Sequence, residues 1–407
     1  MSVSLDSIRT AAQVISGAVM RTPCLPAPKL SRLTGADVWV KYENLQVTNA
    51  FKERGALVKL SSLSPEDRRR GVIAMSAGNH AQAVAYHAGR LGIPATIVMP
   101  KPTPFVKVAA TRGYGARVVL AGEMLADAQA EAERIAEAEG LVWVHPYDDE
   151  AIICGQGTIA LEMLEDHPDL ECLVVPVGGG GLISGMATAA KALRPDIEII
   201  GVEAALYPSM KGALDGKAVQ CGGATLAEGI AVKNVGKLTL EIVRNSVDDI
   251  LLVDEATIEQ AVNAYLTQQK TMAEGAGAAG LAALLSHRER FAGRSVGLVM
   301  CGGNIDPRLL SSIMVRGLAH EGRLLSIRIT TPDRPGVLGD ISTLIGSLGG
   351  NILEVSHHRL FLNVPAKGTT LDVTMETHDR THAQEILAAL ESRDFSVRML
   401  DLGESRL

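Results

Sequence analysis

The sequence predicts an α/β protein with two parallel-sheet αβα subdomains and a small C-terminal domain of βαββαβ, ferredoxin-like order. From about residue 7 to residue 319, short apolar runs alternate with helical patterns, which is typical of parallel sheets covered by helices on both faces. Near Glu321 this alternation gives way to the order strand, helix, strand, strand, helix, strand, which is that of a ferredoxin-like unit. A length of 407 residues also favours two or three domains over one.

The first part of the chain contains eight apolar runs of strand length, which are bounded by turn residues or helical patterns. The expected strands are Val38–Tyr42, Val72–Met75, Ala95–Val98, Arg117–Leu120, Cys172–Val177, Ile197–Val202, Ile250–Val253 and Ser295–Met300. Helices are expected between them, for example over Asn79–Leu91, Glu123–Glu139 and Gly185–Ala192. The predicted domain covers residues 1–320, with a small subdomain at roughly 45–150.

The second domain is predicted over residues 324–402, after a short polar connector within Gly317–Gly322. Its expected strands are Leu324–Thr330, Asn351–Leu360, Thr369–Glu376 and Phe395–Leu400, and its expected helices are Gly336–Leu348 and Thr381–Leu390.

Composition excludes several classes of protein. A formal net charge of -7 argues against a nucleic-acid binder. No apolar run is long enough to span a bilayer, and no signal peptide is evident at the N-terminus. The five cysteines are scattered without a CxxC pair, so a zinc site is not indicated and reduced thiols in a cytoplasm are expected.

Four glycine-bearing segments are expected beyond the carboxyl ends of strands, where open α/β sheets bind ligands. They are residues 76–80 (SAGNH), 177–182 (VGGGGL), 274–280 (EGAGAAG) and 301–304 (CGGN). In the second, a strand leads through four glycines into a helix, so consecutive N–H groups can converge on a phosphate. No Gly-Lys-Ser/Thr follows, and Ile183 replaces the third glycine of a dinucleotide fingerprint. A tight strand-to-helix turn is the alternative.

The other candidates have ordinary interpretations when each is taken alone. Ser76 or Asn79 could cap the following helix, and His80 could be a structural histidine. The segment at Cys301 could be a plain turn. Lys52, in the sequence NAFKERGAL, resembles a solvated helix residue beside Glu53 and Arg54.

The joint occurrence of these segments resembles a known family. NAFKERGAL resembles the cofactor-lysine motif of fold-type II enzymes that depend on pyridoxal 5'-phosphate (PLP), specifically threonine dehydratases (threonine ammonia-lyases) and their serine dehydratase and serine racemase relatives. SAGNHAQAVA, VPVGGGGLISG, GVE (201–203), EGAGAAGL and CGGN follow in the family's order. The match covers roughly 320 residues, and the tail resembles an ACT domain through TPDRPGVL (331–338).

The resemblance implies a role for each matching residue. Lys52 would be the Schiff-base lysine and general base, Asn79 would bond the cofactor's phenolic oxygen, and Cys301 would face the pyridine nitrogen. The residues implied at the cofactor are Phe51, Lys52, Asn79, Gly178, Gly179, Gly180, Gly181, Leu182, Glu274 and Cys301. Those implied near the substrate carboxylate are Ser76, Ala77, Gly78 and His80.

The resemblance further implies dehydration and deamination of L-threonine to 2-oxobutanoate and ammonia, and of L-serine to pyruvate. Serine racemase is an alternative, but Ala77 stands where racemases have a Ser, and a methyl group cannot transfer a proton. With Tyr207 and Ser209 near Glu203, the racemase metal site looks incomplete, so no metal is predicted. A hydroxyaspartate dehydratase and an amino-acid sensor with an inactive catalytic domain are the remaining alternatives.

The ACT-like tail suggests regulation. A branched-chain amino acid such as isoleucine or valine would bind between ACT domains of a homodimer or homotetramer and shift activity, as in an enzyme of isoleucine biosynthesis. The alternative is a tail that only assists dimerisation, because allostery requires demonstrated coupling between sites. No nucleic-acid or membrane partner is expected.

Overall fold

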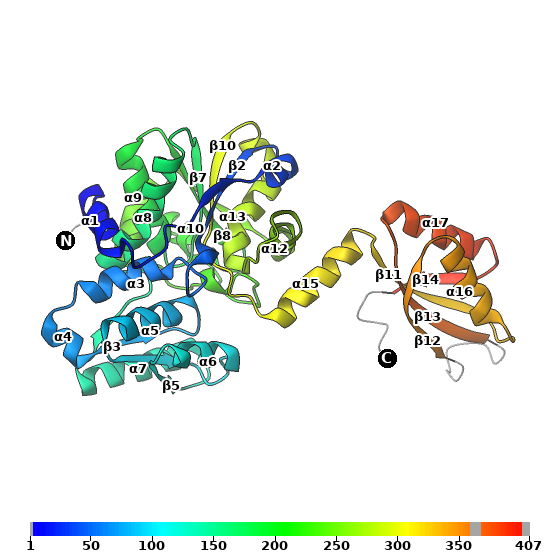
Figure 1. Ribbon diagram of the computed structural model, residues 1–407, viewed down its shortest axis with the longest axis horizontal. Coiled ribbons are helices and arrows are strands. Elements are labelled where there is room, and N and C mark those ends of the chain that lie inside the picture. The colour runs from blue at the N-terminus through cyan, green and yellow to red at the C-terminus, as the bar shows by residue number, and fades with distance from the viewer. Residues whose placement is uncertain (1–2, 359–367, 401–407) are drawn as a thin grey trace. The chain divides into compact units, whose positions relative to one another are not determined.

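A computed structural model describes residues 3–358 and 368–400 of the chain, which form two compact units (Figure 1). The first unit comprises Met1–Ile305 and the second Asp306–Leu407. The predicted domain limits, 1–320 and 324–402, stay predictions. Residues 317–320 are not the polar connector expected from the sequence but the last turn of helix α15 (Pro307–His320). Apolar residues recur between Leu309 and Leu318, with Ile313 buried, and the helix continues to His320.

The first unit contains a six-stranded sheet in the order β1-β2-β10-β7-β8-β9. Its strands are β1 (Cys24–Pro26), β2 (Asp37–Tyr42), β7 (Cys172–Pro176), β8 (Glu198–Ala204), β9 (Asp249–Val253) and β10 (Ser295–Met300). All neighbours are parallel except β1, a short edge strand antiparallel to β2. The predicted parallel sheet is therefore confirmed, with one antiparallel edge added.

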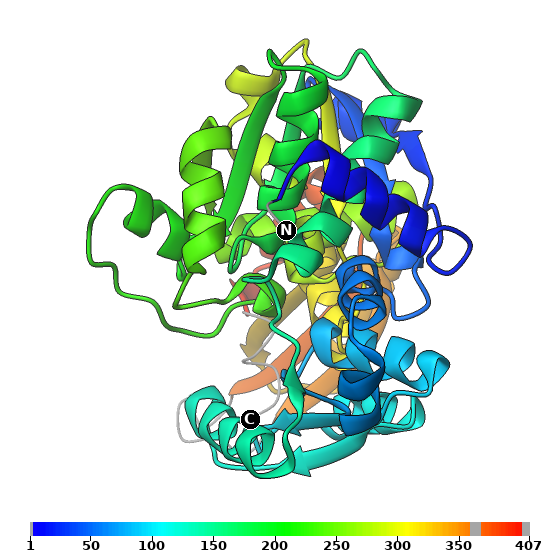
Figure 2. The ribbon, with the colours of Figure 1, turned by 90° about the vertical axis from the view of Figure 1, so that its left-hand side faces the viewer.

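A second, four-stranded parallel sheet in the order β5-β4-β3-β6 forms the small subdomain. Its strands are β3 (Val72–Met75), β4 (Ala95–Met99), β5 (Arg117–Leu120) and β6 (Val142–Trp143). Figure 2 shows the two subdomains one above the other.

Helices cover both faces of each sheet (Figure 1). In the large subdomain, α2, α12 and α13 lie on one face, and α8 and α9 with α1 and α11 on the other. The large-subdomain helices are α1 (Leu5–Ile15), α2 (Pro28–Thr34), α8 (Glu150–Asp166), α9 (Gly181–Leu193), α10 (Ser209–Leu214), α11 (Lys237–Ser246), α12 (Glu255–Gln269), α13 (Gly275–Ser286), α14 (Arg288–Phe291), and the 3-10 turns η1 (Glu43–Leu45) and η2 (Glu228–Ile230). The small-subdomain helices are α3 (Lys52–Ser61), α4 (Pro65–Arg70), α5 (Asn79–Leu91), α6 (Phe105–Gly113) and α7 (Leu125–Glu139).

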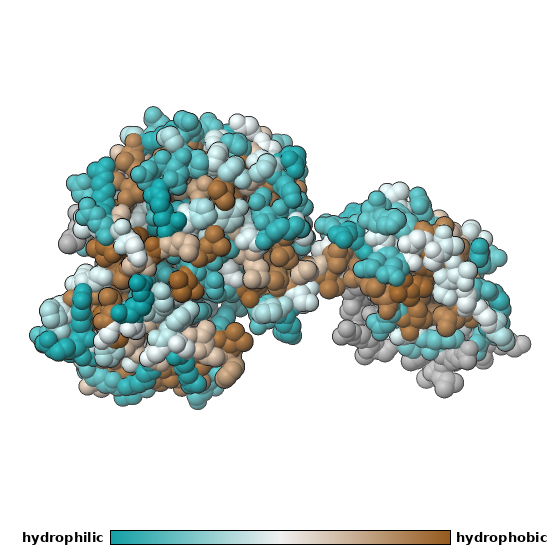
Figure 3. Space-filling view, in the orientation of Figure 1, coloured by the Kyte–Doolittle hydropathy of each residue, from teal (hydrophilic) through white to brown (hydrophobic). Residues whose placement is uncertain are grey.

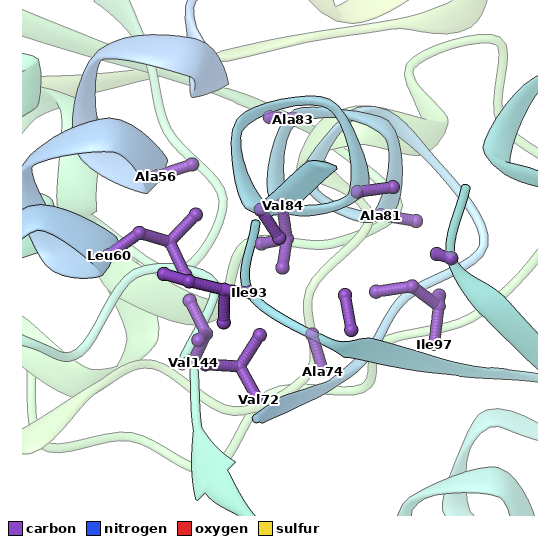
Figure 4. Close-up of a cluster of buried hydrophobic side chains, with 14 of the residues drawn as sticks. Ala56, Leu60, Val72, Ala74, Ala81, Ala83, Val84, Ile93, Ile97 and Val144 are labelled. Atoms are coloured by element: carbon purple, nitrogen blue, oxygen red, sulfur yellow. The ribbon is translucent and has the colours of Figure 1, made fainter. Parts of the chain in front are cut away.

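The small subdomain has its own core of aliphatic side chains (Figure 4). Leu60 of α3 and Val84 of α5 point toward Val72 and Ile97 of the sheet, and all four are fully buried. Because a chain with 3% aromatic residues offers few large rings, this core is filled by Ala, Val, Leu and Ile. Through Ala56 and Leu60, this core holds α3, the helix that begins at Lys52.

Glycines let three helices approach closely behind Lys52. A Cβ on Gly155 of α8 would lie 2.5 Å from the Cα of Gly55 in α3, and one on Gly185 of α9 would lie 2.2 Å from the Ile153 carbonyl oxygen. These neighbours are backbone atoms that cannot move aside. The helix pairs α3–α8 and α8–α9 are therefore held at short range by the absence of side chains.

We expect Gly185→Ala to destabilise the protein by about 1–3 kcal/mol, because the added methyl group overlaps the backbone of α8. The gain in helix propensity, about 1 kcal/mol, does not offset this overlap. Urea unfolding measures the change. Gly113→Ala, at the end of α6 with no atom within 4 Å of the new Cβ, is the matched control and should cost nothing. Equal effects of the two substitutions would contradict the packing argument.

The second unit has the predicted βαββαβ order. Its antiparallel sheet has the order β12-β13-β11-β14, formed by β11 (Leu324–Pro332), β12 (Asn351–His358), β13 (Gly368–Glu376) and β14 (Ser396–Met399), with α16 (Val337–Ser347) and α17 (Arg380–Glu391). The expected residues 359–360 of the second strand and 401–402 of the domain lie outside the described residues.

The surface of the described residues is mixed in character. Figure 3 shows hydrophilic and hydrophobic residues interspersed on one face of the first unit. Phe105 and Val106 at the start of α6 are 78% and 66% exposed. Within residues 3–358 and 368–400, every helix is too short or too polar to cross a membrane.

Candidate active site

Lys52 is the first residue of α3 and faces the junction of the two subdomains. Its Nζ donates a hydrogen bond to the carbonyl oxygen of Pro146 at 2.8 Å and lies 5.0 Å from the centroid of the Phe51 ring. Burial of the ammonium group lowers the pKa of Lys52 to about 8, although the charges of Cys301 and Glu274 act in the opposite direction. About a tenth of this amine is therefore neutral and nucleophilic at pH 7, far more than for a lysine with an ordinary pKa.

The two residues after Lys52 hold α3 in place through buried hydrogen bonds and ion pairs. Glu53 accepts a hydrogen bond from the Thr48 N–H at 2.5 Å. Arg54, fully buried, bonds Glu43 at 2.8 Å and Glu162 at 2.6 Å. The charged pair that made Lys52 look solvent-exposed in the sequence thus points inward, and it ties α3 to η1 and α8.

The segment before Lys52 is paired with the segment after β10. The Phe51 N–H donates to the Cys301 carbonyl at 3.0 Å, and the Gly303 N–H donates to the Asn49 carbonyl at 2.9 Å. Asn49 has a φ of 56° in the left-handed region, which asparagine tolerates better than most residues. The Cys301 side chain is buried, and burial raises the pKa of its thiol well above 9, so the sulfur stays protonated.

Asn79 and Glu274 meet beside this pairing. Asn79 Nδ2 donates to Glu274 Oε1 at 2.7 Å, while Asn304 Nδ2 donates to Asn79 Oδ1 at 2.8 Å. Burial raises the pKa of Glu274 to about 7, and the hydrogen bond from Asn79 limits the rise. A Cβ on Gly302 would lie 2.5 Å from Glu274 Oε1, so this position leaves room only for glycine.

Residues 274–280 are not at a strand end, contrary to expectation. Glu274 is the residue before α13, which follows α12 rather than a strand. The segment still reaches the site because the Glu274 N–H donates to the Gly302 carbonyl at 3.0 Å. The other three glycine-bearing segments follow β3, β7 and β10, as predicted.

The glycine run Gly178–Gly181 joins β7 to α9. Gly180 has a φ of 95°, which disfavours any side chain, and no side chain caps α9. The helix begins at Gly181, four residues earlier than expected, with Leu182 buried in its first turn. Uncapped N–H groups at the start of a helix form a site suited to a phosphate.

Residues 76–80 form the turn from β3 into α5. Ser76, Ala77, Gly78 and Asn79 are half-buried, and no side chain caps the helix. His80 differs from its predicted neighbours because its ring is buried and its Nε2 bonds the Val144 carbonyl oxygen at 2.9 Å. Burial lowers the pKa of His80 to about 3, so the ring is neutral and its Nε2 is already occupied.

The sequence reasoning missed the loop at residues 145–149. Besides the Pro146 carbonyl that accepts from Lys52, the Tyr147 ring would lie 2.3 Å from a Cβ on Gly179, so it packs directly on the glycine run. Asp148 accepts from the backbone N–H groups at the start of α11, and Asp149 caps α8 and binds Lys59. Two consecutive aspartates before a helix were the available signal.

Glu203 is buried. Its carboxylate accepts hydrogen bonds from the Met210 and Lys211 N–H groups at 2.7 and 2.9 Å. Burial raises its pKa to about 7. Among the described residues, no three His, Cys, Asp or Glu side chains gather in a way that could hold a metal ion. The absence of a metal stays a prediction.

Comparison with known proteins gives a consistent result. The family model described as "Pyridoxal-phosphate dependent enzyme" matches residues 15–302, and that of the ACT domain matches residues 325–395. The L-threonine ammonia-lyase of Thermotoga maritima is 44% identical over 400 residues, covering 98% of this chain and 100% of that protein.

Two solved structures resemble the fold. Maize serine racemase is 35% identical with a TM-score of 0.73, over 79% of this chain and 100% of that one. The processed threonine deaminase isoform 2 of Solanum lycopersicum is 35% identical with a TM-score of 0.72, over 78% of this chain and 87% of that one.

Proposed function

Because this chain belongs to the pyridoxal-phosphate-dependent enzyme family and carries an ACT domain, we propose that it deaminates L-threonine to 2-oxobutanoate and ammonia. The protein is a PLP-dependent ammonia-lyase. The observation that carries the choice of threonine is the identity of 44% with an L-threonine ammonia-lyase over nearly the whole of both chains.

The residues present fit PLP. The Lys52 amine has a lowered pKa, as covalent attachment to an aldehyde requires. A Cβ at Gly180 would lie 2.6 Å from Met210 and one at Gly179 would lie within the Tyr147 ring, so the run is a cradle of bare backbone. Asn79 would bond the phenolic oxygen, Cys301 would face the pyridine nitrogen and Phe51 would pack near the ring. Gly178–Gly181 and Leu182 would bind the phosphate.

When bound, the cofactor supplies an electron sink for the negative charge that forms at the substrate Cα. The protein must provide a base, an anion site and a polar partner. Neutral Lys52 Nζ accepts the α-proton, and the Pro146 carbonyl holds that nitrogen in place. The unfilled N–H groups at the start of α5 would bind the substrate carboxylate. To leave as water, the β-hydroxyl takes up one proton, which balances the proton that Lys52 accepts. Hydrolysis of the resulting enamine releases ammonia and the keto acid.

The protonated thiol of Cys301 favours elimination over reactions that need a stabilised carbanion. A neutral thiol is a weak hydrogen-bond partner and does not transfer a full charge to the pyridine nitrogen. A ring nitrogen left unprotonated favours elimination over a long-lived carbanion. This favours water loss from a β-hydroxy amino acid, including L-serine, over reactions that need a stabilised carbanion.

Serine racemase remains the second candidate because of the likeness to the maize enzyme. Racemisation needs an acid on the face of Cα opposite Lys52, and Ala77 has no transferable proton there. The test is a substrate panel of L-threonine, L-serine and β-hydroxyaspartate, with keto-acid detection and chiral analysis of serine. We expect 2-oxobutanoate to form fastest and D-serine to be absent. Appreciable D-serine, or a preference for β-hydroxyaspartate, would overturn the assignment.

The lowered pKa of Lys52 predicts how PLP attachment depends on pH. Since only the neutral amine attacks the aldehyde, the rate of attachment to cofactor-free protein should rise about tenfold per pH unit below pH 8 and level off above it. Stopped-flow absorbance measures this rate. A lysine peptide with an ordinary pKa is the comparison, and its rate should still climb above pH 9. A protein profile that follows the peptide would contradict the argument.

We also propose that isoleucine or valine binds the ACT domain and changes activity, as in isoleucine biosynthesis, and that the chain acts as a homodimer or homotetramer in the cytoplasm. The ACT match and the free state of all five cysteines support these proposals. Kinetics of the full-length protein with and without each branched-chain amino acid test regulation, and light scattering tests assembly. No kinetic response to any of them would leave the tail a dimerisation module.

A further inference from the structure

Asn304, which ends the CGGN segment, lies where three parts of the site meet. Its Nδ2 donates to the Thr48 carbonyl oxygen at 2.8 Å and to Asn79 Oδ1 at 2.8 Å. Its Oδ1 accepts from Asn49 Nδ2 at 3.4 Å. Asn79 is a predicted cofactor residue, whereas no role of its own was assigned to Asn304 from the sequence.

The contacts of Asn304 determine which way the Asn79 carboxamide points. A backbone carbonyl oxygen only accepts hydrogen bonds, so the Asn304 atom that faces Thr48 must be nitrogen. That same nitrogen faces Asn79, so the Asn79 atom opposite it must be oxygen. The remaining Asn79 atom is then nitrogen, and it faces Glu274 Oε1 at 2.7 Å.

Shape alone would not enforce this orientation, because the oxygen and nitrogen of a carboxamide are nearly the same size and only their partners distinguish them. The Asn79 NH2 group has two hydrogens, and Glu274 takes one. The second is available to the neighbouring ligand. In the reversed orientation, Asn79 would present an oxygen to the Glu274 carboxyl group and to that ligand.

We propose that Asn304 is a positioning residue. Its hydrogen bond to the Thr48 carbonyl fixes its own orientation, and this in turn orients the Asn79 carboxamide so that an N–H of Asn79 points at the phenolic oxygen of PLP. This rests on the proposed function, since it takes PLP as the ligand. A donor at the phenolic oxygen favours its deprotonated form. Loss of that donor should raise the pH at which the visible absorbance of the bound cofactor titrates and should weaken cofactor binding.

The test compares two substitutions at Asn304 in the full-length protein. Asn304→Asp keeps the shape but places a carboxylate opposite Asn79 Oδ1. Below about pH 7, where Glu274 is largely protonated and can donate a hydrogen bond to Asn79 Oδ1, the Asn79 amide should turn round and lose its donor to the cofactor. Asn304→Ala removes the constraint without imposing the reverse. Asn245→Asp is the matched control, because it adds the same charge on the exposed surface of α11, where Asn245 bonds only Glu241 of its own helix in the described structure.

Three quantities should be measured: the titration midpoint of the visible band, the dissociation constant for PLP, and the melting temperature of the cofactor-free protein. We expect about 10-fold to 100-fold weaker PLP binding for Asn304→Asp, a smaller loss for Asn304→Ala, and none for the control. The midpoint should rise in the same order. The titratable groups already around Asn79, namely Glu274, Lys52, Cys301 and His80, are unchanged in Asn304→Ala, whereas Asn304→Asp adds one carboxyl group beside them.

The outcomes separate this inference from the proposed function. If the unaltered protein shows no visible band with PLP, the proposed function fails and the inference fails with it. If it shows the band and the Asn304 variants keep its midpoint and affinity, only the inference is overturned. A fall in melting temperature with an unchanged midpoint would identify a purely structural role and would also overturn it. Should Asn304→Asp fail to fold, Asn304→Ala decides by the same criteria.

Discussion

Lys52→Ala should lower kcat for threonine deamination by at least about a thousandfold. The substitution removes the amine that attaches to PLP and that accepts the α-proton, and among the described residues Lys52 is the lysine that hydrogen-bonds the Pro146 carbonyl at the subdomain junction. The neighbouring His80 cannot replace it as the base, because a pKa of about 3 makes its imidazole a weak proton acceptor and its Nε2 is bonded to the Val144 carbonyl oxygen. Keto-acid formation under saturating threonine and PLP measures the loss.

A second measurement distinguishes loss of chemistry from loss of folding. Borohydride reduction followed by mass spectrometry should show a PLP adduct on the unaltered protein and none on Lys52→Ala. The matched control is Lys29→Ala, since Lys29 is exposed on α2 in the large subdomain. It should keep both the adduct and the activity. A Lys52→Ala protein with undiminished kcat would show that another group is the base.

Arg54→Met should destabilise the protein by about 3–5 kcal/mol, because it leaves a buried carboxylate without its partner. The side chains of Arg54 and Glu43 are both 0% exposed, and the ammonium group of Lys41 forms its ion pair with Glu162 at 2.5 Å. Burial alone would raise the pKa of Glu43, but the Arg54 guanidinium outweighs it and holds the pKa below 4.5. Methionine fills similar space yet offers no charge.

The destabilisation should depend on pH. In the unaltered protein, the depressed pKa of Glu43 contributes stability above about pH 4.5 that is lost as pH falls through the folded pKa. In Arg54→Met the unpaired, desolvated carboxyl group should titrate above its unfolded value, so its contribution is lost as pH rises. The difference in the free energy of unfolding should therefore widen between about pH 4 and pH 7.

Urea unfolding at several pH values measures this difference, and Arg21→Met is the matched control. Arg21 also binds two carboxylates, Glu165 and Asp166, but its side chain is 49% exposed. An exposed pair contributes about 1 kcal/mol or less. Two results would contradict the prediction: an equal loss of unfolding free energy in both variants, or a difference that stays constant between about pH 4 and pH 7. Either would show that the buried Glu43 carboxylate does not need Arg54 as a partner.

Much of the fold could be predicted because short-range signals were consistent. Strands β3, β5 and β10 and helix α5 have the bounds expected from the sequence, since each apolar run is bordered by turn residues. The start of α9 was wrong by four residues because glycine disfavours a helix in isolation. Here the tight contact with α8 and the left-handed Gly180 make Gly181 a suitable first residue.

The residues of the candidate site could be predicted only in part from the sequence. The resemblance to fold-type II enzymes selected Lys52, Asn79, Glu274 and the glycine run, whereas local patterns made Lys52 an ordinary charged residue. Asp148 and Asp149 marked the loop at Pro146 and Tyr147 as a helix start, but a backbone carbonyl and a ring packed on glycine leave no pattern that would show their place in the site. The role of Asn304 was also missed, because it depends on hydrogen bonds to Thr48 and Asn79 that only the folded chain forms.

The sequence by itself determined the strand–helix alternation, the change at Glu321 and the order of the glycine segments, because these depend on residues close together in the chain. Only the tertiary structure decided that Glu53 and Arg54 point inward, that Lys52 lies in surroundings that lower its pKa, and that Asn304 orients Asn79. These features depend on burial and, for Arg54, Lys52 and Asn304, on partners from other segments such as Glu162, Pro146 and Asn79, which local spacing does not encode.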